Sequence, residues 1–145
     1  MVVKLKSTLQ ALQGFLQASG RFQAVTIGEP KDPPDGVHGA IFLADYGMPM
    51  VMLNGGSVER RTVTVRIYIN ALREPRGDIE FLMDDIVSEL LEDFCGDYDL
   101  GGTVRDIKPT EITTRFGYQT VGQVLYRIAD ITLPMTVDDS ATFAK

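Results

Sequence analysis

The segment RRTVTVRIYINA, residues 60–71, decides the fold because its apolar side chains fall on every second position. The apolar positions are Val63, Val65, Ile67 and Ile69, and the positions between them are Thr62, Thr64, Arg66 and Tyr68. Because side chains alternate between the two sides of a strand, this pattern predicts a strand with one buried face and one face in water.

A hairpin arm is predicted immediately before this strand. The tripeptide Asn54-Gly55-Gly56 is typical of a tight turn, since Asn and Gly tolerate positive φ. Apolar residues precede the turn, so residues 37–53 and the opening strand are expected to form a long β-hairpin with its tip near Asn54. Three methionines, Met48, Met50 and Met52, crowd near that tip. Methionine suits contact surfaces that must adapt, but these side chains could equally belong to the protein's own core.

The N-terminal part reads as a helix, a short strand and a loop. Leucines recur at three- and four-residue spacing over residues 3–18, which predicts an amphipathic helix that ends at Ser19-Gly20. Residues 22–27 are expected to be a strand. The proline-rich segment 28–36 is expected to be an exposed loop, because proline cannot donate a ladder hydrogen bond. A second strand is predicted over residues 37–46.

The C-terminal part reads as an acidic helix and two strands. Apolar residues recur at helical spacing over residues 78–94, and Asp and Glu cover much of the remaining surface. Two further strands are expected to meet at Gly117-Tyr118, and the last of them covers residues 121–133. The predicted fold is α+β: a mainly antiparallel sheet of about five strands, with both helices packed on one face. Residues 1–145 are expected to form a single domain.

The composition argues against several classes of function. The formal net charge is −6, which argues against sequence-independent binding of nucleic acid. A single cysteine excludes an internal disulfide and fits a reducing compartment. No apolar stretch approaches the roughly 18 residues of a membrane span, so no membrane partner is expected.

No residue pattern predicts catalysis. His38 is the only histidine, and it stands in a predicted strand without a nucleophile motif elsewhere, so a partly buried structural histidine is expected. Cys95 is expected to be a small apolar filler. The carboxylates of the acidic helix lie around one element and do not converge as metal ligands do. We therefore expect no enzyme, no metal and no cofactor.

Charge is divided between neighbouring segments of the chain. Arginines gather at Arg60, Arg61, Arg66, Arg73 and Arg76, and the acidic residues Asp84, Asp85, Glu89 and Glu92 follow on the next helix. Opposite charges on different faces of one subunit would let copies join head to tail and close into a ring. The alternative for Arg66 is an ion pair within its own subunit, and the alternative for the acidic helix is a solvated face.

This order of elements resembles the tail terminator proteins of long-tailed, non-contractile bacteriophages. The likeness rests on the opening helix TLQALQGFLQA, the strand HGAIFLAD, the alternating strand TVTVRIYINA, the acidic helix DIEFLMDDIVSELLEDF and the final strand VGQVLYRIADITLPM. It covers nearly the whole chain. Head-completion and tail tube proteins of the same virions share this α+β order of helices and strands.

The resemblance implies a structural virion protein without catalytic residues. Such proteins form a ring, a hexamer in this family, that caps the tail tube, stops its polymerisation and provides the surface for head-tail joining. The implied partners are sister copies, the tail tube protein and the connector or head-completion protein, with DNA passing through the lumen unbound. The implied location is the tail or neck of the virion, assembled in the host cytoplasm. Alternatives are a head-completion or connector adaptor, a tail tube-like subunit, a small-ligand domain with a concave pocket and, last, an enzyme.

Overall fold

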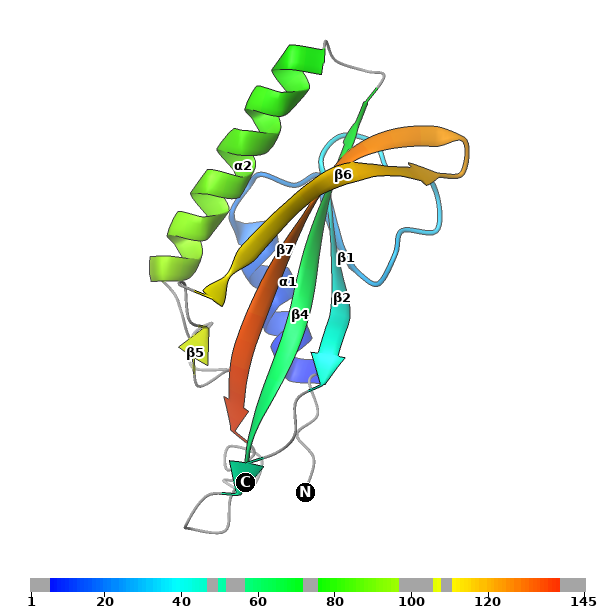
Figure 1. Ribbon diagram of the computed structural model, residues 1–145. Coiled ribbons are helices and arrows are strands. Elements are labelled where there is room, and N and C mark those ends of the chain that lie inside the picture. Colours follow the sequence, from blue (N-terminus) through cyan, green and yellow to red (C-terminus); the bar gives the residue numbers. More distant parts are fainter. Residues whose placement is uncertain are drawn as a thin grey trace.

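The fold is α+β and is built on one mixed, mostly antiparallel sheet (Figure 1). This computed structural model describes residues 6–46, 50–51, 57–71, 76–96, 106–107 and 111–138. Within these ranges, the side chains of residues 44–46, 50–51, 57–60, 76–77, 106–107 and 136–138 lie outside the description. The predicted fold class is confirmed. The tip of the predicted arm lies outside the described residues.

The described chain forms two helices and seven strands. In chain order they are α1 (Lys6–Ala18), β1 (Ala24–Ile27), β2 (His38–Tyr46), β3 (Met50–Val51), β4 (Ser57–Asn70), α2 (Arg76–Gly96), β5 (Asp106–Ile107), β6 (Thr113–Val121) and β7 (Val124–Asp138). The strand order is β1-β2-β4-β7-β5, with β3 paired to β4 and β6 paired to β7. Only β1 and β2 pair in parallel among these strands.

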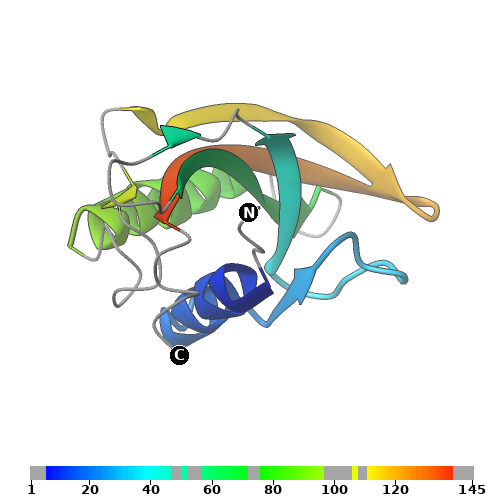
Figure 2. The ribbon, with the colours of Figure 1, turned by 90° about the horizontal axis from the view of Figure 1, so that it is seen from below.

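The alternation in residues 60–71 holds in the structure. The odd-numbered residues Val63, Val65, Ile67 and Ile69 are buried in one apolar cluster. That cluster also contains Leu12 of α1, Leu90 of α2 and Leu133 of β7, so both helices and the central strands share it. Figure 2 shows these elements together, with the curved strands and the two helices against them. None of the described helices combines the length and apolar character needed to cross a bilayer.

The other face of β4 departs from the predicted wet face at Tyr68, whereas Thr62, Thr64 and Arg66 are partly exposed. Tyr68 is fully buried, and it forms a second apolar cluster with Ala40, Tyr126 and Ile128. Within this cluster, the hydroxyl of Tyr126 donates a 2.7 Å hydrogen bond to the carbonyl of Pro34, in the loop after β1. Tyr68 is therefore enclosed by residues of β2 and β7, which the local sequence pattern cannot show.

Several boundaries differ from the sequence-based prediction. The strands predicted for residues 22–27, 37–46 and 121–133 span Ala24–Ile27, His38–Tyr46 and Val124–Asp138. The helix predicted for residues 78–94 spans Arg76–Gly96. The turn predicted at Gly117-Tyr118 lies instead between Val121 and Val124, and Gly122 has a φ of 63° there. Only glycine takes this conformation without strain, whereas Gly117 continues in the strand.

Candidate functional site

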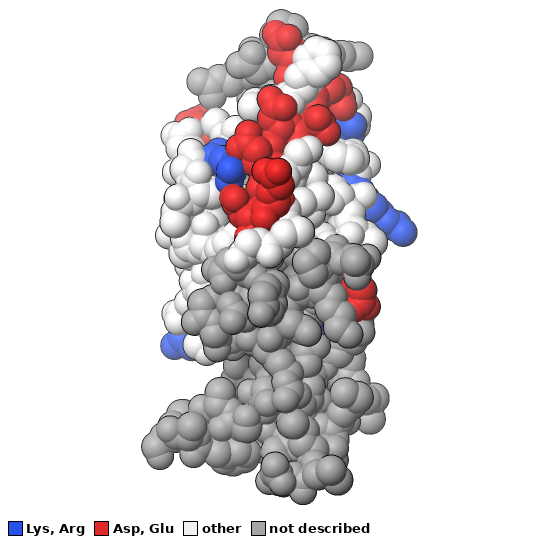
Figure 3. Space-filling view, turned by 90° about the vertical axis from the view of Figure 1, so that its left-hand side faces the viewer, with Lys and Arg blue, Asp and Glu red and all other residues white. Residues whose placement is uncertain are grey.

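The acidic residues of α2 lie on an exposed surface of the molecule (Figure 3). Asp84, Asp85, Glu89 and Glu92 are all exposed, and we call these four residues the acidic stripe. They point outward because the apolar residues at helical spacing, such as Met83 and Leu90, are buried in the core. The stripe is therefore the exposed polar side of an amphipathic helix.

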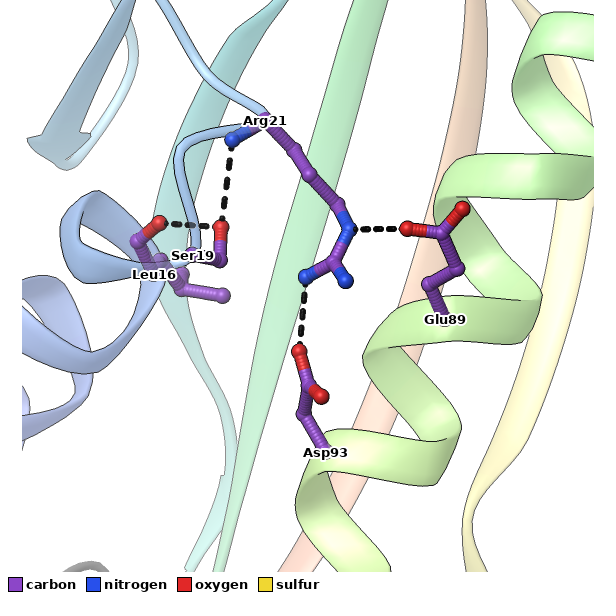
Figure 4. A network of polar contacts seen from close by, with 5 residues as sticks. All are labelled: Leu16, Ser19, Arg21, Glu89 and Asp93. Carbon is purple, nitrogen blue, oxygen red and sulfur yellow. Dashed lines mark hydrogen bonds and ion pairs between the residues drawn. The ribbon is translucent and has the colours of Figure 1, made fainter.

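Arg21 partly neutralises the end of this surface. Its Nε donates a 2.7 Å hydrogen bond to Glu89, and its Nη1 donates a 2.6 Å hydrogen bond to Asp93 (Figure 4). The bond to Glu89 raises the pKa of Arg21, which burial alone would lower. Arg21 stands just after α1, where Ser19 accepts a hydrogen bond from its backbone N–H. The contact ties the end of α1 to α2, and sequence analysis did not identify it.

Arg66 forms its ion pair inside the subunit. Its Nε lies 2.7 Å from one carboxylate oxygen of Asp130, and its Nη2 donates a 3.0 Å bond to the other. Its Nη1 donates to Gln119, and its guanidinium lies 5.2 Å from the ring centroid of Phe42. The hydrogen bonds that Arg66 donates to Asp130 raise the pKa of Arg66. Of the two alternatives for Arg66, the internal ion pair is the one observed.

The other predicted interface residues divide into two groups. Arg61 is buried, with 9 % of its surface exposed, so it does not belong to a free basic surface. The remaining predicted residues lie outside the described side chains: Met48, Met50, Met52, Arg60, Arg73 and Arg76. In the single subunit Arg61 is buried and Arg66 pairs with Asp130, and the predicted interface role of Arg60, Arg61, Arg66, Arg73 and Arg76 stays a prediction.

An aromatic surface lies where β6 meets the N-terminal half of α2. Phe116 and Tyr118 are 50 % and 58 % exposed, and Arg127 of β7 lies over both rings, 5.7 and 4.7 Å from their centroids. Glu80 of α2 holds Arg127 through a 2.7 Å ion pair, and the carbonyl of Gly117 accepts a 3.0 Å hydrogen bond from Arg127. Sequence analysis missed this surface, although Phe116 and Tyr118 stand two residues apart and therefore share one side of a strand.

The side chain of His38 is buried and contacts Thr26 and Tyr68. It is 5 % exposed, and its ring lies 5.9 Å from that of Tyr68. Thr26 uses its one hydroxyl proton in a 3.0 Å bond to the carbonyl of Gly28, so its oxygen accepts the 3.0 Å bond from His38 Nε2–H. Burial lowers the pKa of His38, which favours the neutral ring. The expectation of a buried strand histidine is confirmed.

Cys95 departs from its expected role. It was predicted to be a small apolar filler, but it is exposed near the end of α2. The reason is helical spacing: Leu90 and Phe94 take the buried positions, and residue 95 turns away from them. Among the described side chains, no three His, Cys, Asp or Glu residues form a group that could hold a metal ion.

No family model matches this chain, and no curated protein matches it either.

Proposed function

We propose that this protein is a structural subunit of a phage virion that forms a ring on the tail tube. The ring stops polymerisation of the tube and offers the surface that joins tail to head. The proposal starts from the resemblance in element order, and the observed α+β fold with its mainly antiparallel sheet is compatible with it.

The observation that carries the proposal is the acidic stripe on α2. Three of its carboxylates, Asp84, Asp85 and Glu92, carry like charge on one exposed helix face, and Glu92 near the C-terminal end also opposes the helix dipole, whereas Glu89 already pairs with Arg21. A partner with basic groups would offset both the repulsion between the carboxylates and the unfavourable interaction of Glu92 with the helix dipole. In the proposed ring that partner is the neighbouring copy, whose Arg73 and Arg76 would meet the stripe.

The interface geometry of a ring also suits opposite charges better than like ones. A head-to-tail contact brings two different surfaces of the subunit together, so a basic segment and an acidic helix can face each other at every interface. Such pairs mainly fix register and exclude wrong partners. The negative overall charge would keep passing DNA from binding in the lumen.

The experiment uses tail tubes from the virus or prophage that carries the gene. Negative-stain microscopy of tubes mixed with the protein is expected to show a ring at one end. Tubes so capped are expected not to lengthen when tube subunits are added. Continued growth at saturating protein would reject the proposal, and binding to isolated head connectors without tube binding would favour the head-completion alternative.

Charge reversal tests which contacts build the ring. Asp84→Lys/Asp85→Lys is expected to abolish rings, and Arg73→Glu/Arg76→Glu is expected to do the same. Combining the four substitutions is expected to restore rings, because each interface regains opposite charges. Lys31→Glu, on the exposed loop after β1, is the matched control and should leave rings unchanged. Rings that survive both double substitutions would reject the charge pairing.

A further inference from the structure

Strand β6 has one edge that pairs with no strand among the residues the structure describes. Its nine residues pair with β7 without a register shift, from Thr113 opposite Thr132 to Val121 opposite Val124. Edge strands in natural proteins are commonly protected by lysine, proline, bulges or a covering element. The sequence of β6, TTRFGYQTV, contains one charged residue, Arg115, and neither lysine nor proline.

The hydrogen-bonding pattern shows which residues present the free edge. Val121 and Val124 close a two-residue turn and so exchange backbone hydrogen bonds, and such pairs alternate along an antiparallel ladder. The carbonyl of Leu125 accepts a 2.9 Å bond from the N–H of Ala71, so Leu125 directs its backbone toward β4, as this alternation requires. The outward backbone groups of β6 therefore belong to Thr114, Phe116, Tyr118 and Thr120.

The types of these four residues are nearly symmetric about Gly117, the middle residue of the strand: an aromatic residue stands one position away on each side, and a threonine stands three positions away on each side. If a second β6 pairs antiparallel with Gly117 opposite Gly117, Phe116 faces Tyr118 of the other copy and Thr114 faces Thr120. Each such pair exchanges two backbone hydrogen bonds. Aromatic pairs and threonine pairs are also among the cross-strand partners that stabilise sheets.

Charge favours the same register. With Gly117 on the two-fold axis, Arg115 faces the uncharged Gln119 of the other copy. Sliding the strands to place Arg115 on the axis would set two guanidinium groups opposite each other, which is unfavourable. The centred register also uses all nine residues of β6. Phe116 and Tyr118 are fixed beforehand by Arg127, which Glu80 and the Gly117 carbonyl hold in place.

We infer that β6 is a self-complementary docking edge, at which a second copy of this chain adds its own β6 antiparallel and joins two sheets across a two-fold axis. The contact is isologous: the same surface is used on both copies. It concerns the free protein and does not depend on the proposed ring, whose contacts would be head to tail.

Disulfide trapping tests the register. In a Cys95→Ser background, Gly117→Cys is expected to give a disulfide-linked dimer under mild oxidation. Residues that face each other in a non-hydrogen-bonded antiparallel pair lie about 4.5 Å apart at Cα, within disulfide range. A Cβ at Gly117 meets only Ile128 Cγ1, at an ordinary 3.9 Å, so the strand should tolerate it. Arg115→Cys is the matched control, because it faces Gln119 and should not cross-link. Equal or stronger cross-linking of Arg115→Cys would overturn the inference.

Sedimentation equilibrium tests the contact without cross-linking. The wild-type protein is expected to form dimers, and Phe116→Lys or Tyr118→Glu alone should weaken dimerisation at least tenfold. The double variant Phe116→Lys/Tyr118→Glu is expected to recover dimers, because opposite charges then face each other twice across the axis. A wild-type protein that remains monomeric at several hundred micromolar, or a double variant no better than either single one, would overturn the inference. Circular dichroism of each variant checks that it is folded.

Discussion

At the scale of single residues, burial decides what the few titratable side chains can do. His38 is enclosed between Thr26 and the ring of Tyr68, and its pKa is lowered because the interior disfavours the charged ring. The folded protein therefore takes up a proton at His38 only below the ordinary value of 6.5, whereas the unfolded chain does so at that value. Because the unfolded state binds more protons at this group, the contribution of His38 to the free energy of unfolding falls as pH falls below about 6.5.

His38→Gln is expected to remove this contribution. Glutamine can still donate an N–H to Thr26 Oγ1 but does not titrate, and the carboxylates shared by both proteins cancel in the comparison. Urea unfolding at pH 7.5, 6.5 and 5.5 should give a free energy of unfolding that falls more steeply for the wild type, by at most about 1.4 kcal/mol per pH unit. Parallel pH curves for the two proteins would contradict the assignment.

Also at the residue scale, the Tyr68 hydroxyl is buried and meets no hydrogen-bond partner within the described part of the chain, whereas the Tyr126 hydroxyl bonds to Pro34. Burial raises the pKa of Tyr68, and nearby Arg66 partly offsets that effect. Burial raises the pKa of Tyr126 as well. Both rings therefore remain neutral near pH 7 and act in the second apolar cluster through packing, with ring centroids 5.8 Å apart.

At the scale of elements, the β6–β7 hairpin depends on its turn. Gly122 has a φ of 63°, and its position lies against Pro33 of the loop after β1. This one residue therefore serves two purposes: it reverses the chain, and it leaves room for Pro33 of that loop.

Gly122→Ala and Gly122→Asn separate these two purposes. Both add a Cβ about 3.1 Å from Pro33 Cγ, but asparagine adopts positive φ more readily than alanine. Alanine is therefore expected to lower the free energy of unfolding by about 1 kcal/mol or more, and asparagine by less. Thermal or urea unfolding of the two variants measures the difference. If they are equally stable, positive φ is not what position 122 requires.

At the scale of the whole molecule, one apolar cluster joins α1, α2 and the central strands. The second cluster shares β4 and β7 with it, so neither layer can lose its packing without affecting the other. The expectation that residues 1–145 form a single domain stays a prediction, and this shared packing makes it testable.

The chain is expected to unfold in one cooperative step. Far-ultraviolet circular dichroism follows the helices, and tyrosine fluorescence follows the rings, undisturbed because the sequence has no tryptophan. The two probes should give coincident midpoints in urea. Separate midpoints would mean that the helices and the sheet are independent units.

The sequence by itself determined the elements and their apolar sides. Period-two alternation identified the core face of β4, and helical spacing placed the acidic stripe on the outside of α2. These are local properties, because the geometry of a strand or helix fixes where each side chain points. The chain positions of Gly and Pro marked loops but not every turn, since Gly117 and Gly122 look alike in sequence.

Only the tertiary structure decided what covers each face and which charges meet. Arg66 pairs with Asp130, 64 positions away, and Arg21 pairs with Glu89, 68 positions away. Tyr68, on the side of β4 that the pattern predicts to be wet, is buried in a cluster with Tyr126, which in turn bonds to Pro34, 92 positions away from it. The physical reason is that long-range pairing sets these contacts, and residue spacing within one element carries no information about which distant segment will lie against it.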